Sequence, residues 1–246
     1  MSAALHPDWI VPDWPAPPSV KAFITTRAGG VSAGPYASFN PSPRVGDDPA
    51  AVERNLEILR SVLPADPVWL RQVHGTQVVD AASAAPYTEA DGSVAHVRHI
   101  VCGVWTADCM PVLFADREGH AVGVAHAGWR GLAAGVLEAT LARLGVAPER
   151  VMAYLGPAIS QRAFEVGNDV YEAFVNDDPE AADAFLPGAA GKYHADLYAL
   201  ARLRLARAGV KEVYGGGFCT YTQAERFYSF RRDRVTGRMA SLIWLD

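Results

Sequence analysis

Three side chains able to ligate a metal follow apolar segments that lie far apart in the chain. They are His74 in RQVHG, Cys109 in TADCMPV and His126 in VAHAGWRG. Strand ends flanked by Gly or Pro hold side chains rigidly while leaving them accessible. Two imidazoles and one thiolate are the donor set of a catalytic Zn²⁺ that keeps a fourth position open for water. Together the three residues predict a zinc centre, although a single His or a buried Cys alone is at least as often structural.

Other titratable side chains in the same region are weaker candidates. Cys102 lies seven residues before Cys109, so in one continuous strand the two would point to opposite faces, and we interpret Cys102 as a core residue. His96 and His99 are interpreted as loop surface. Asp108 either orients a ligand imidazole or bonds the backbone of the turn in which it lies.

Composition excludes several classes of protein. The 246 residues are 50% hydrophobic and 20% charged, as in an ordinary globular protein and unlike a disordered chain. A net charge of −5 without a basic run argues against nucleic acid as a partner, and three cysteines without a CxxC pair argue against a disulfide scaffold. The apolar stretch 121–146 is interrupted by His126 and Arg130, so no membrane partner is expected. The start MSAALHPDWI does not read as a secretory signal, and we expect a cytoplasmic protein.

Familiar cofactor signatures are missing from the sequence. It has no GxxxxGK[ST] phosphate loop, no GxGxxG, no GxSxG and no HExxH. The run Gly215–Gly217 indicates close backbone packing, because no helical pattern follows it. Any chemistry must therefore come from residues assembled in space.

The elements that position these residues are predicted from hydrophobic periodicity. Strands are expected at Val20–Thr26, Val68–Val73, Thr76–Val79, His99–Thr106, Pro111–Ala115, Ala121–Ala125, Val151–Leu155, Val210–Tyr214, Phe227–Phe230 and Met239–Trp244. Helices are expected at Pro49–Val62, from Gly128 to Gly145, and near Asp169–Val175 and Asp196–Ala208. Long loops fill Arg27–Asp48 and the stretch reaching Asp91, and FYSFRRDRVTGR is interpreted as a late strand pair whose arginines form ion pairs. This irregular alternation predicts an α+β fold with mixed sheets flanked by helices, in one domain over 1–246 with a Pro-rich lead-in at 1–19.

A set of short motifs in fixed order is more specific than any one of them. TTRAGGVS, FN followed by VGDDP, QVHG, TADCMPVL, AHAGWRGL, LGPAIS, FEVG, FCT and FYSFRRDRVTGR resemble, in this order, the multicopper polyphenol oxidase or laccase-like family. That family is now mostly regarded as a purine nucleoside phosphorylase family and is also called peptidoglycan editing factor. The match covers nearly the whole chain, and it departs from the family pattern at PSPR after Asn40 and at QRAF before FEVG.

The resemblance implies a function and a fold. It implies that His74, Cys109 and His126 form a zinc-bound active site, with copper the less favoured metal. The implied reactions are phosphorolysis of adenosine, inosine, guanosine and S-methyl-5'-thioadenosine, and hydrolytic deamination of adenosine. The implied fold is related to the cytotoxic necrotizing factor-like cysteine hydrolases. Purine nucleoside and phosphate are then the expected partners, with the oligomeric state left open between monomer and homodimer.

The two reactions make different demands on the surrounding residues. Deamination suits a zinc ion, which lowers the pKa of water, and Asp108, or the more distant Glu165, is the candidate for moving the proton. Phosphorolysis needs an anion site, for which the planar fork of Arg is suited. Candidates for substrate or phosphate binding are Asn40, Arg44, Arg71, Arg130 and Arg231, and the sequence does not choose among the arginines, since each also suits a surface ion pair. Trp129 either stacks on a purine or packs in the core.

Three alternative functions stay open at this point. A cysteine amidohydrolase would use Cys109 as nucleophile and a His as base without a metal, which would suit peptidoglycan precursor editing. Copper-dependent phenol oxidation fits poorly, because the several copper sites of a multicopper oxidase together need more histidine ligands than the seven histidines present. A non-catalytic nucleotide-binding module is the third alternative.

Overall fold

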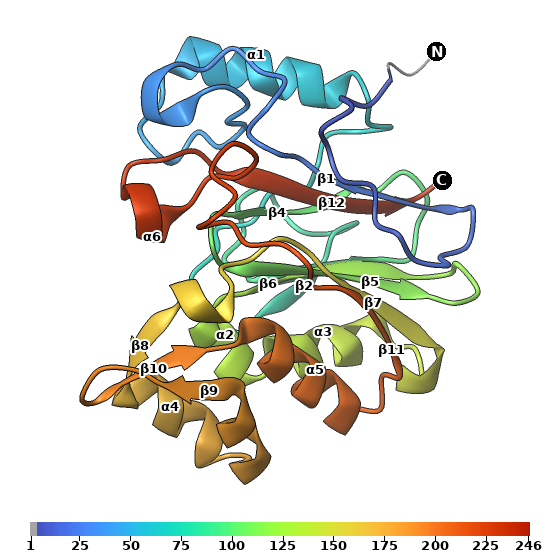
Figure 1. Cartoon of the computed structure of the whole chain (residues 1–246). Helices are drawn as coiled ribbons and strands as arrows, with labels where there is room; N and C mark the ends of the chain where they lie inside the picture. The colour runs from blue at the N-terminus through green and yellow to red at the C-terminus, as the bar shows by residue number, and fades with distance from the viewer. Residues whose placement is uncertain (1–3) are drawn as a thin grey trace.

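The most continuous apolar segments of the chain form the six-stranded sheet at the centre of the computed structural model, which describes residues 4–246 (Figure 1). In spatial order its strands are β11 (Glu212–Gly215), β7 (Val151–Leu155), β5 (Met110–Asp116), β6 (Val122–Ala127), β3 (Gly92–Ala95) and β2 (Val78–Asp80). The two outer pairs are parallel and the inner pairs are antiparallel. The predicted mixed sheet is confirmed.

A second sheet packs on one face of the central sheet. It consists of β1 (Val20–Ile24), β12 (Met239–Leu245) and β4 (Cys102–Thr106), all antiparallel. Leu113, Val124 and Ile243 belong to the buried apolar cluster between the two sheets. The outer face of the second sheet is covered by α1 (Pro49–Arg60), through Leu59 and its neighbours Trp69 and Trp244 (Figure 1).

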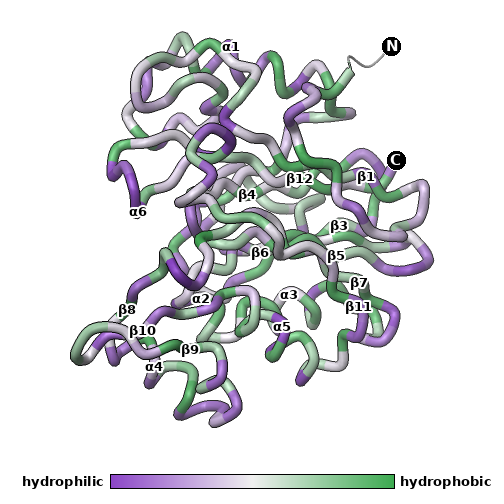
Figure 2. Tube along the Cα trace, in the orientation of Figure 1, coloured by the Kyte–Doolittle hydropathy of each residue, from purple (hydrophilic) through white to green (hydrophobic). Residues whose placement is uncertain are grey.

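Helices cover the opposite face of the central sheet. They are α2 (Trp129–Ala134), α3 (Val136–Leu144) and α5 (Leu197–Arg207) (Figure 1). Val112 faces this helical layer while the next residue, Leu113, faces the second sheet, as the two-residue period of a strand requires. Figure 2 shows the hydrophobic colour running along these strands, with hydrophilic residues at the connections. A sheet buried on both faces explains why its strands read as nearly continuous apolar runs.

The remaining segments form a small lower unit and several short turns. The unit contains α4 (Asn168–Val175) and a sheet of β8 (Glu165–Gly167), β10 (Lys192–Ala195) and β9 (Phe185–Pro187). This sheet lies within a stretch for which no strand is predicted. The short helix α6 (Phe230–Asp233) and 3₁₀ turns at Gly34–Tyr36, Pro148–Arg150, Gln161–Ala163 and Pro179–Ala184 complete the described elements.

Helix ends follow local sequence chemistry. Asp48 caps α1 by accepting a hydrogen bond from the Ala50 amide, and Pro49 occupies the first turn, where it loses no bond. The helix predicted from Gly128 to Gly145 is split at Gly135, whose φ of +99° ends α2 and begins α3. The predicted end at Gly145 is confirmed, with a φ of +68°.

Two predicted strands are wrong for the same physical reason. Val68–Val73 makes only isolated bridges at Val68 and Arg71, and the amide of Val73 bonds the Asp91 carboxylate instead of a strand. Phe227–Phe230 is not a strand, because the segment leads into α6, which is capped by the Ser229 side chain. In both segments a side-chain atom accepts a backbone donor that a sheet partner would otherwise receive: the Asp91 carboxylate accepts from Val73, and the Met239 sulfur accepts from Tyr228.

Smaller differences concern strand limits. β4 begins at Cys102 instead of His99, and the strand predicted over Thr76–Val79 is β2, shifted to Val78–Asp80. β3, which directly follows the loop predicted to reach Asp91, was not predicted, because Gly and Ser in its GSVA sequence weaken the strand pattern.

The described part of the lead-in packs against the second sheet. Ile10 pairs with Ile24, and the Trp9 ring stacks on Phe23 with 5.3 Å between ring centroids. Residues 1–3 of the predicted lead-in lie outside the described residues. Among residues 4–246, no helix is both long enough and apolar enough to cross a membrane.

Candidate metal centre and its cleft

The β5–β6 pair brings two of the three predicted ligands together. Pro111 on β5 lies opposite His126 on β6, so Cys109, at the residue just before β5, lies beside the His126 end of the hairpin. His74 arrives from the loop between α1 and β2, in a left-handed conformation with a φ of +61°. Three segments far apart in sequence thus meet at one end of the central sheet.

The geometry of the three side chains fits a tetrahedral metal. The Cys109 sulfur lies 3.7 Å from Nε2 of His74, and the two imidazole rings are 4.8 Å apart between centroids. All three ligand atoms lie within 4.8 Å of one another. A zinc ion with Zn–S near 2.3 Å and Zn–N near 2.0–2.1 Å separates sulfur from nitrogen by roughly 3.6 Å in a tetrahedron. The donor set and its spacing therefore fit zinc.

Gly128 leaves the space in which these side chains meet. A Cβ placed on Gly128 would lie 2.7 Å from Cδ2 of His74 and 2.9 Å from the Cys109 sulfur. Both contacts are closer than real Cβ atoms approach. The glycine in AHAGW is thus required by the close approach of two ligands, in addition to starting α2.

A carboxylate that the sequence analysis did not propose for the site forms hydrogen bonds with two of the three candidate ligands, His126 and His74. Asp91 is fully buried, and its Oδ1 lies 2.8 Å from Nδ1 of His126. The same carboxylate accepts hydrogen bonds from the amides of Val73, His74 and Gly75 at 3.1, 3.0 and 2.7 Å. An acidic residue inside the apolar run ADGSVA was the available signal for it.

The His/Cys/His group holds a negative charge on the Cys109 sulfur and a positive charge on the His126 imidazole. Burial alone would raise the pKa of the Cys109 thiol, but the adjacent His126 and then His74 lower that pKa to about 6. Burial would lower the pKa of His126, but the Cys109 thiolate and the Asp91 carboxylate raise that pKa to about 9. The two shifts describe one thiolate–imidazolium pair, and a thiolate is the form of cysteine that binds metals.

The group opens into a cleft of about 550 Å³. Figure 1 shows α6 in the upper layer and α2 in the lower layer on the same side of the molecule, and both contribute residues to this cleft. Besides the three ligands, the cleft is lined by Ser42, Arg44, Val45, Leu70, Gln72, Trp105, Thr106, Ala107, Asp108, Trp129, Arg130, Ile159, Phe164, Phe230, Arg231 and Arg238. Its charged lining consists of four arginines and one aspartate, so the cleft favours an anion.

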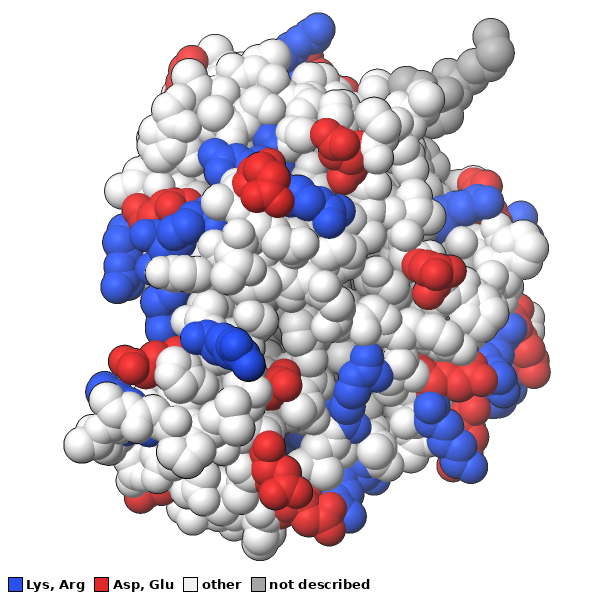
Figure 3. All heavy atoms as spheres, viewed as in Figure 1, with Lys and Arg blue, Asp and Glu red and all other residues white. Residues whose placement is uncertain are grey.

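Three of the predicted binding arginines line this cleft. They are Arg44, Arg130 and Arg231. Arg130 lies over the Trp129 ring at 4.3 Å, and Arg231 donates through its guanidinium to the Glu165 carbonyl. Figure 3 shows basic side chains gathered over α6, a part of the chain that carries Arg231 and its neighbours.

Other predicted binding residues lie outside the lining. Arg71 forms an ion pair with Glu89. The Asn40 side chain is fully buried, donating to Asp47 and accepting from the Arg238 amide. Glu165 is also absent from the lining and meets the site only through its backbone carbonyl.

Asp108 lines the cleft, but both of its carboxylate oxygens are engaged. Oδ1 accepts from the Thr220 hydroxyl and Oδ2 from the Arg231 amide, each at 2.6 Å. Asp108 itself has a φ of +85°. Neither role weighed from the sequence is observed, because Asp108 bonds the Thr220 hydroxyl and the amide of the distant Arg231 instead of its own turn, and the carboxylate beside the imidazole is Asp91.

Two cleft residues were missed by the sequence analysis. Arg238 is fixed by donating to the carbonyls of Thr236 and Gly237, and burial lowers its pKa while Cys109 and Asp108 oppose that shift. Phe230 exposes 48% of its surface at the cleft. Both lie in the segment wrongly predicted as a strand pair, so their side chains were assigned to ion pairs and packing.

The weaker sequence interpretations have clear outcomes. Cys102 is fully buried, which confirms it as a core residue. His96 and His99 are exposed, which confirms them as surface residues. Trp129 lines the cleft but is partly covered by Arg130.

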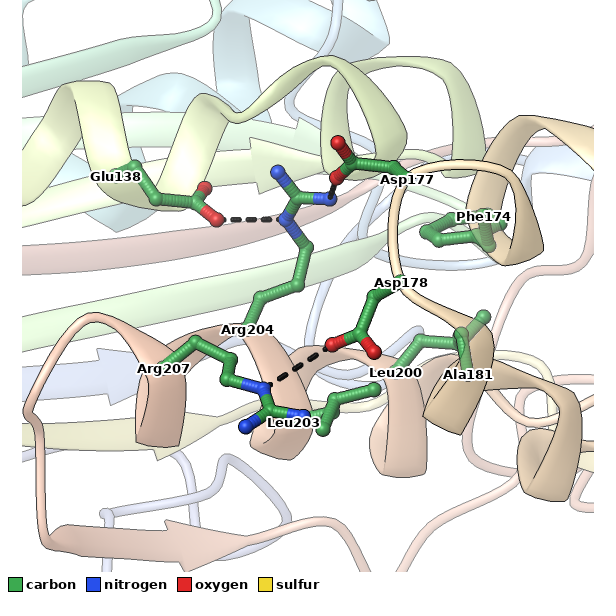
Figure 4. Close-up of a pocket in the computed structure, with 9 residues that line it drawn as sticks. All are labelled: Glu138, Phe174, Asp177, Asp178, Ala181, Leu200, Leu203, Arg204 and Arg207. Carbon is green, nitrogen blue, oxygen red and sulfur yellow. Dashed lines mark hydrogen bonds and ion pairs between the residues drawn. The ribbon is translucent and has the colours of Figure 1, made fainter.

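A second hollow of about 360 Å³ lies between α3, α4 and α5 (Figure 4). Arg204 crosses it to reach both Glu138 and Asp177, and Arg207 binds Asp178. Its floor is apolar, with Leu200 and other side chains of the helical layer. No Cys or His lines it, and its arginines are already paired, so it offers no ligand set comparable with the first.

The mixed-sheet fold, with a His/Cys/His group at an open cleft, defines a class of α+β proteins whose candidate metal centre is assembled from strand ends and a loop. Within this class the chain belongs to the family described as multi-copper polyphenol oxidoreductase laccase, whose family model matches residues 21–246. The family resemblance drawn from the ordered motifs is thereby confirmed.

Similar proteins span nearly the whole chain. Purine nucleoside phosphorylase PA4543 of Pseudomonas aeruginosa is 53% identical, covering 97% of this chain and 98% of its own length. Purine nucleoside phosphorylase YfiH of Escherichia coli is 52% identical over 96% of this chain and 98% of its own. Among solved structures, Neisseria meningitidis protein NMB0706 superposes with a TM-score of 0.94 at 57% identity, covering 97% of this chain and 99% of its own. YlmD from Geobacillus stearothermophilus gives 0.87 at 31% identity, covering 96% of both chains.

Proposed function

We propose that this protein is a zinc-dependent purine nucleoside phosphorylase. The observation that carries the proposal is a His/Cys/His ligand group with tetrahedral spacing at the floor of a cleft whose charged lining is four arginines and one aspartate. Relatives that match the full length at 53% and 52% identity are named purine nucleoside phosphorylases. Adenosine, inosine, guanosine and S-methyl-5'-thioadenosine are the proposed substrates, with phosphate as the attacking group.

The proposed phosphate site is formed by arginines on both sides of the cleft. A zinc ion held by His74, Cys109 and His126 would supply Lewis acidity and lower the pKa of a bound water. The chain itself supplies the anion site, in which Arg44 and Arg231 offer guanidinium groups that bind phosphate oxygens in pairs. Arg238 is the most rigid of these cations, because two backbone carbonyls fix its position.

The purine is proposed to bind against an aromatic surface of the cleft. Phe230 is exposed there, with Arg234 and Arg238 each 5.9 Å from its ring centroid, whereas Arg130 lies closer over the Trp129 ring, at 4.3 Å. Stacking on an exposed aromatic ring accepts any purine base, which fits the breadth of the proposed substrates. This assigns to Phe230 the role that was considered for Trp129.

Deamination of adenosine is the proposed second reaction of the same site. Water adds to C6 of the base, and ammonia leaves. Asp108 is the proposed proton carrier, since it lines the cleft and the alternative Glu165 does not.

A second candidate function is cysteine-dependent amide hydrolysis without a metal. It is favoured by the alignment Cys109–His126–Asp91, in which a thiolate adjoins an imidazolium held by a carboxylate. In that reaction the sulfur would attack the carbonyl carbon, His126 would pass a proton to the amine as the C–N bond breaks, and water would then hydrolyse the thioester to release the acid and restore the thiol. The proposed relation to the cytotoxic necrotizing factor-like cysteine hydrolases belongs to this candidate.

Product analysis tests the two candidates against each other. Protein of measured metal content is incubated with adenosine and with inosine, with and without phosphate, and the products are identified by mass. Ribose 1-phosphate formed only with phosphate supports the phosphorylase, and inosine formed from adenosine supports the deaminase. Absence of nucleoside turnover by zinc-loaded protein would refute the proposal. A Cys109→Ala sample controls for contaminating enzymes.

A further inference from the structure

We propose that Asp91 is a positioning residue for the metal centre, setting both the ring orientation of His126 and the backbone position of His74. The inference rests on the proposed function only in taking the His/Cys/His group to be a metal site. Asp91 does not itself line the cleft, and its carboxylate contacts the two histidines, so it acts on the site through them.

One carboxylate serves both histidines through four contacts. Oδ1 meets Nδ1 of His126 at 2.8 Å and the amide of His74 at 3.0 Å. Oδ2 accepts from the amides of Val73 and Gly75 at 3.1 and 2.7 Å. Because the carboxylate is fully buried, no water replaces any of these partners without a rearrangement.

The contact with His126 selects one ring tautomer. Nδ1 must carry the proton to donate to Asp91, so Nε2, on the opposite side of the ring, keeps its lone pair for a metal. His126 is also anchored through its backbone, since its amide donates to the Asp91 carbonyl at 2.7 Å. The ring and the main chain of this ligand are therefore both set by the same residue.

The contact with His74 holds a loop in an uncommon conformation. His74 has a φ of +61°, which few residues other than glycine adopt without support. Its side chain is exposed, so packing does not fix it. The three amides gathered on Asp91 supply that support and fix the direction from which His74 approaches Cys109.

Asparagine cannot replace these contacts, although it has the same size. All four partners of the carboxylate are donors, whereas an amide offers one acceptor and one donor group. If the NH₂ group of the introduced amide faced Val73 and Gly75, it would oppose two backbone amides. If the NH₂ group faced His126 instead, it would donate to Nδ1 and favour the tautomer with the proton on Nε2. A protonated Nε2 has no lone pair with which to bind the metal.

The test compares Asp91→Asn with a matched control, Asp196→Asn. The Asp196 carboxylate also accepts hydrogen bonds from backbone amides, those of Tyr198 and Ala199, but it lies at the start of α5 and outside the cleft. The readouts are zinc affinity by competition with a chelator and the visible absorption spectrum of the Co²⁺-loaded protein. Neither depends on turnover.

We expect Asp91→Asn to bind zinc about 10–100-fold more weakly and to change the Co²⁺ spectrum. Asp196→Asn should keep both properties within about twofold, since its carboxylate lies outside the site. Zinc affinity and a Co²⁺ spectrum equal to wild type in Asp91→Asn would overturn the proposal. So would an equal loss in both variants, which would indicate a general effect of replacing a carboxylate that binds backbone amides.

A measurement on the unaltered protein keeps the proposal testable if Asp91→Asn does not fold. Nitrogen-15 spectra of the histidine side chains in zinc-loaded protein should show His126 protonated on Nδ1. A proton on Nε2 would overturn the proposal. Failure of nucleoside turnover alongside these expected metal results would refute the proposed function and leave the role of Asp91 standing.

Discussion

Gly128 is the residue on which the spacing of the ligands most directly depends. We predict that Gly128→Ala weakens zinc binding and lowers turnover about 100-fold. The added methyl group would push His74 and Cys109 apart. A misplacement of catalytic groups by about 1 Å lowers the rate by about that factor. Zinc affinity and nucleoside turnover, measured on the same preparation, check this. Gly217→Ala is the control, since a methyl there meets no atom within 4 Å. A fully active, zinc-loaded Gly128→Ala protein would show that the glycine serves only to start α2.

The thiol of Cys109 should titrate far below an ordinary cysteine in metal-free protein. His126 and His74 lower its pKa to about 6 from the usual 9.0, against the opposing effect of burial. The thiolate, which is the reactive form, is lost only as the pH falls through about 6, so alkylation by iodoacetamide should be half-maximal there. Peptide mapping of the alkylated site against pH measures this.

Cys102 gives the internal comparison for that titration. Burial raises the pKa of its thiol to about 12, so it should stay unmodified throughout. Reaction at Cys109 with a midpoint near the usual thiol pKa of 9.0 would contradict the thiolate–imidazolium pair, and zinc loading should protect the sulfur.

At the residue scale, the sequence identified the candidate ligands but not the residues that hold them in place. His74, Cys109 and His126 stand out because few residue types ligate zinc and each follows an apolar run. Asp91 and Arg238 do not stand out, because their roles depend on which distant backbone groups they meet. Arg71 shows the converse, since a charged residue next to a motif pairs with Glu89 instead of lining the cleft.

Among the elements, α5 fixes the loops that form one rim of the cleft. The Tyr198 hydroxyl accepts from the Ala158 amide at 2.8 Å and lies 2.9 Å from the Phe218 carbonyl, joining the loops that follow β7 and β11. These loops carry Ile159, which lines the cleft, and Thr220, which bonds Asp108. A helix that contributes no residue to the lining thus positions the loops of the cleft.

We predict that Tyr198→Phe lowers the free energy of unfolding by about 1–3 kcal/mol, because it leaves a buried amide without its acceptor. Chemical denaturation measures the change. Tyr171→Phe is the control, since no hydrogen bond of the Tyr171 hydroxyl is found among the described residues, and its effect should stay within about 0.5 kcal/mol. Equal stability of the two variants would show that Tyr198 acts by packing alone.

Elements were predictable where burial alone decides them. β5, β6 and β7 lie inside the central sheet and read as unbroken apolar runs, so their positions were found within a residue or two. The lower unit with β8, β9 and β10 was missed, because strands of three or four residues carry too little pattern. The segments near Val68 and Phe227 were wrongly predicted as strands because the Asp91 carboxylate and the Met239 sulfur accept backbone donors within them, which no local pattern reveals.

At the scale of the whole molecule, a bound metal would connect the loop that follows α1 to the central sheet. His74 comes from the loop that follows α1, whereas Cys109 and His126 belong to the central sheet. A ligand that binds only the folded state stabilises it by mass action, by about 2.7 kcal/mol at about 100 times its dissociation constant. Zinc should therefore stabilise the native protein as a whole.

We predict that chelation lowers the melting temperature by several degrees, about 2–4 °C for each kcal/mol in a chain of this size. Calorimetry before and after chelation, with zinc restored, measures the shift. Cys109→Ala should show no zinc-dependent shift. A zinc-dependent shift of the same size in that variant would place the ion elsewhere.

X-ray absorption at the metal edge of the purified protein tests the central claim most directly. The account predicts a zinc edge, one sulfur neighbour at about 2.3 Å and two imidazole nitrogens at about 2.0–2.1 Å, with a lighter atom completing the tetrahedron. In Cys109→Ala the sulfur neighbour should disappear. A copper edge, or a zinc spectrum with no sulfur in the wild-type protein, would contradict the account.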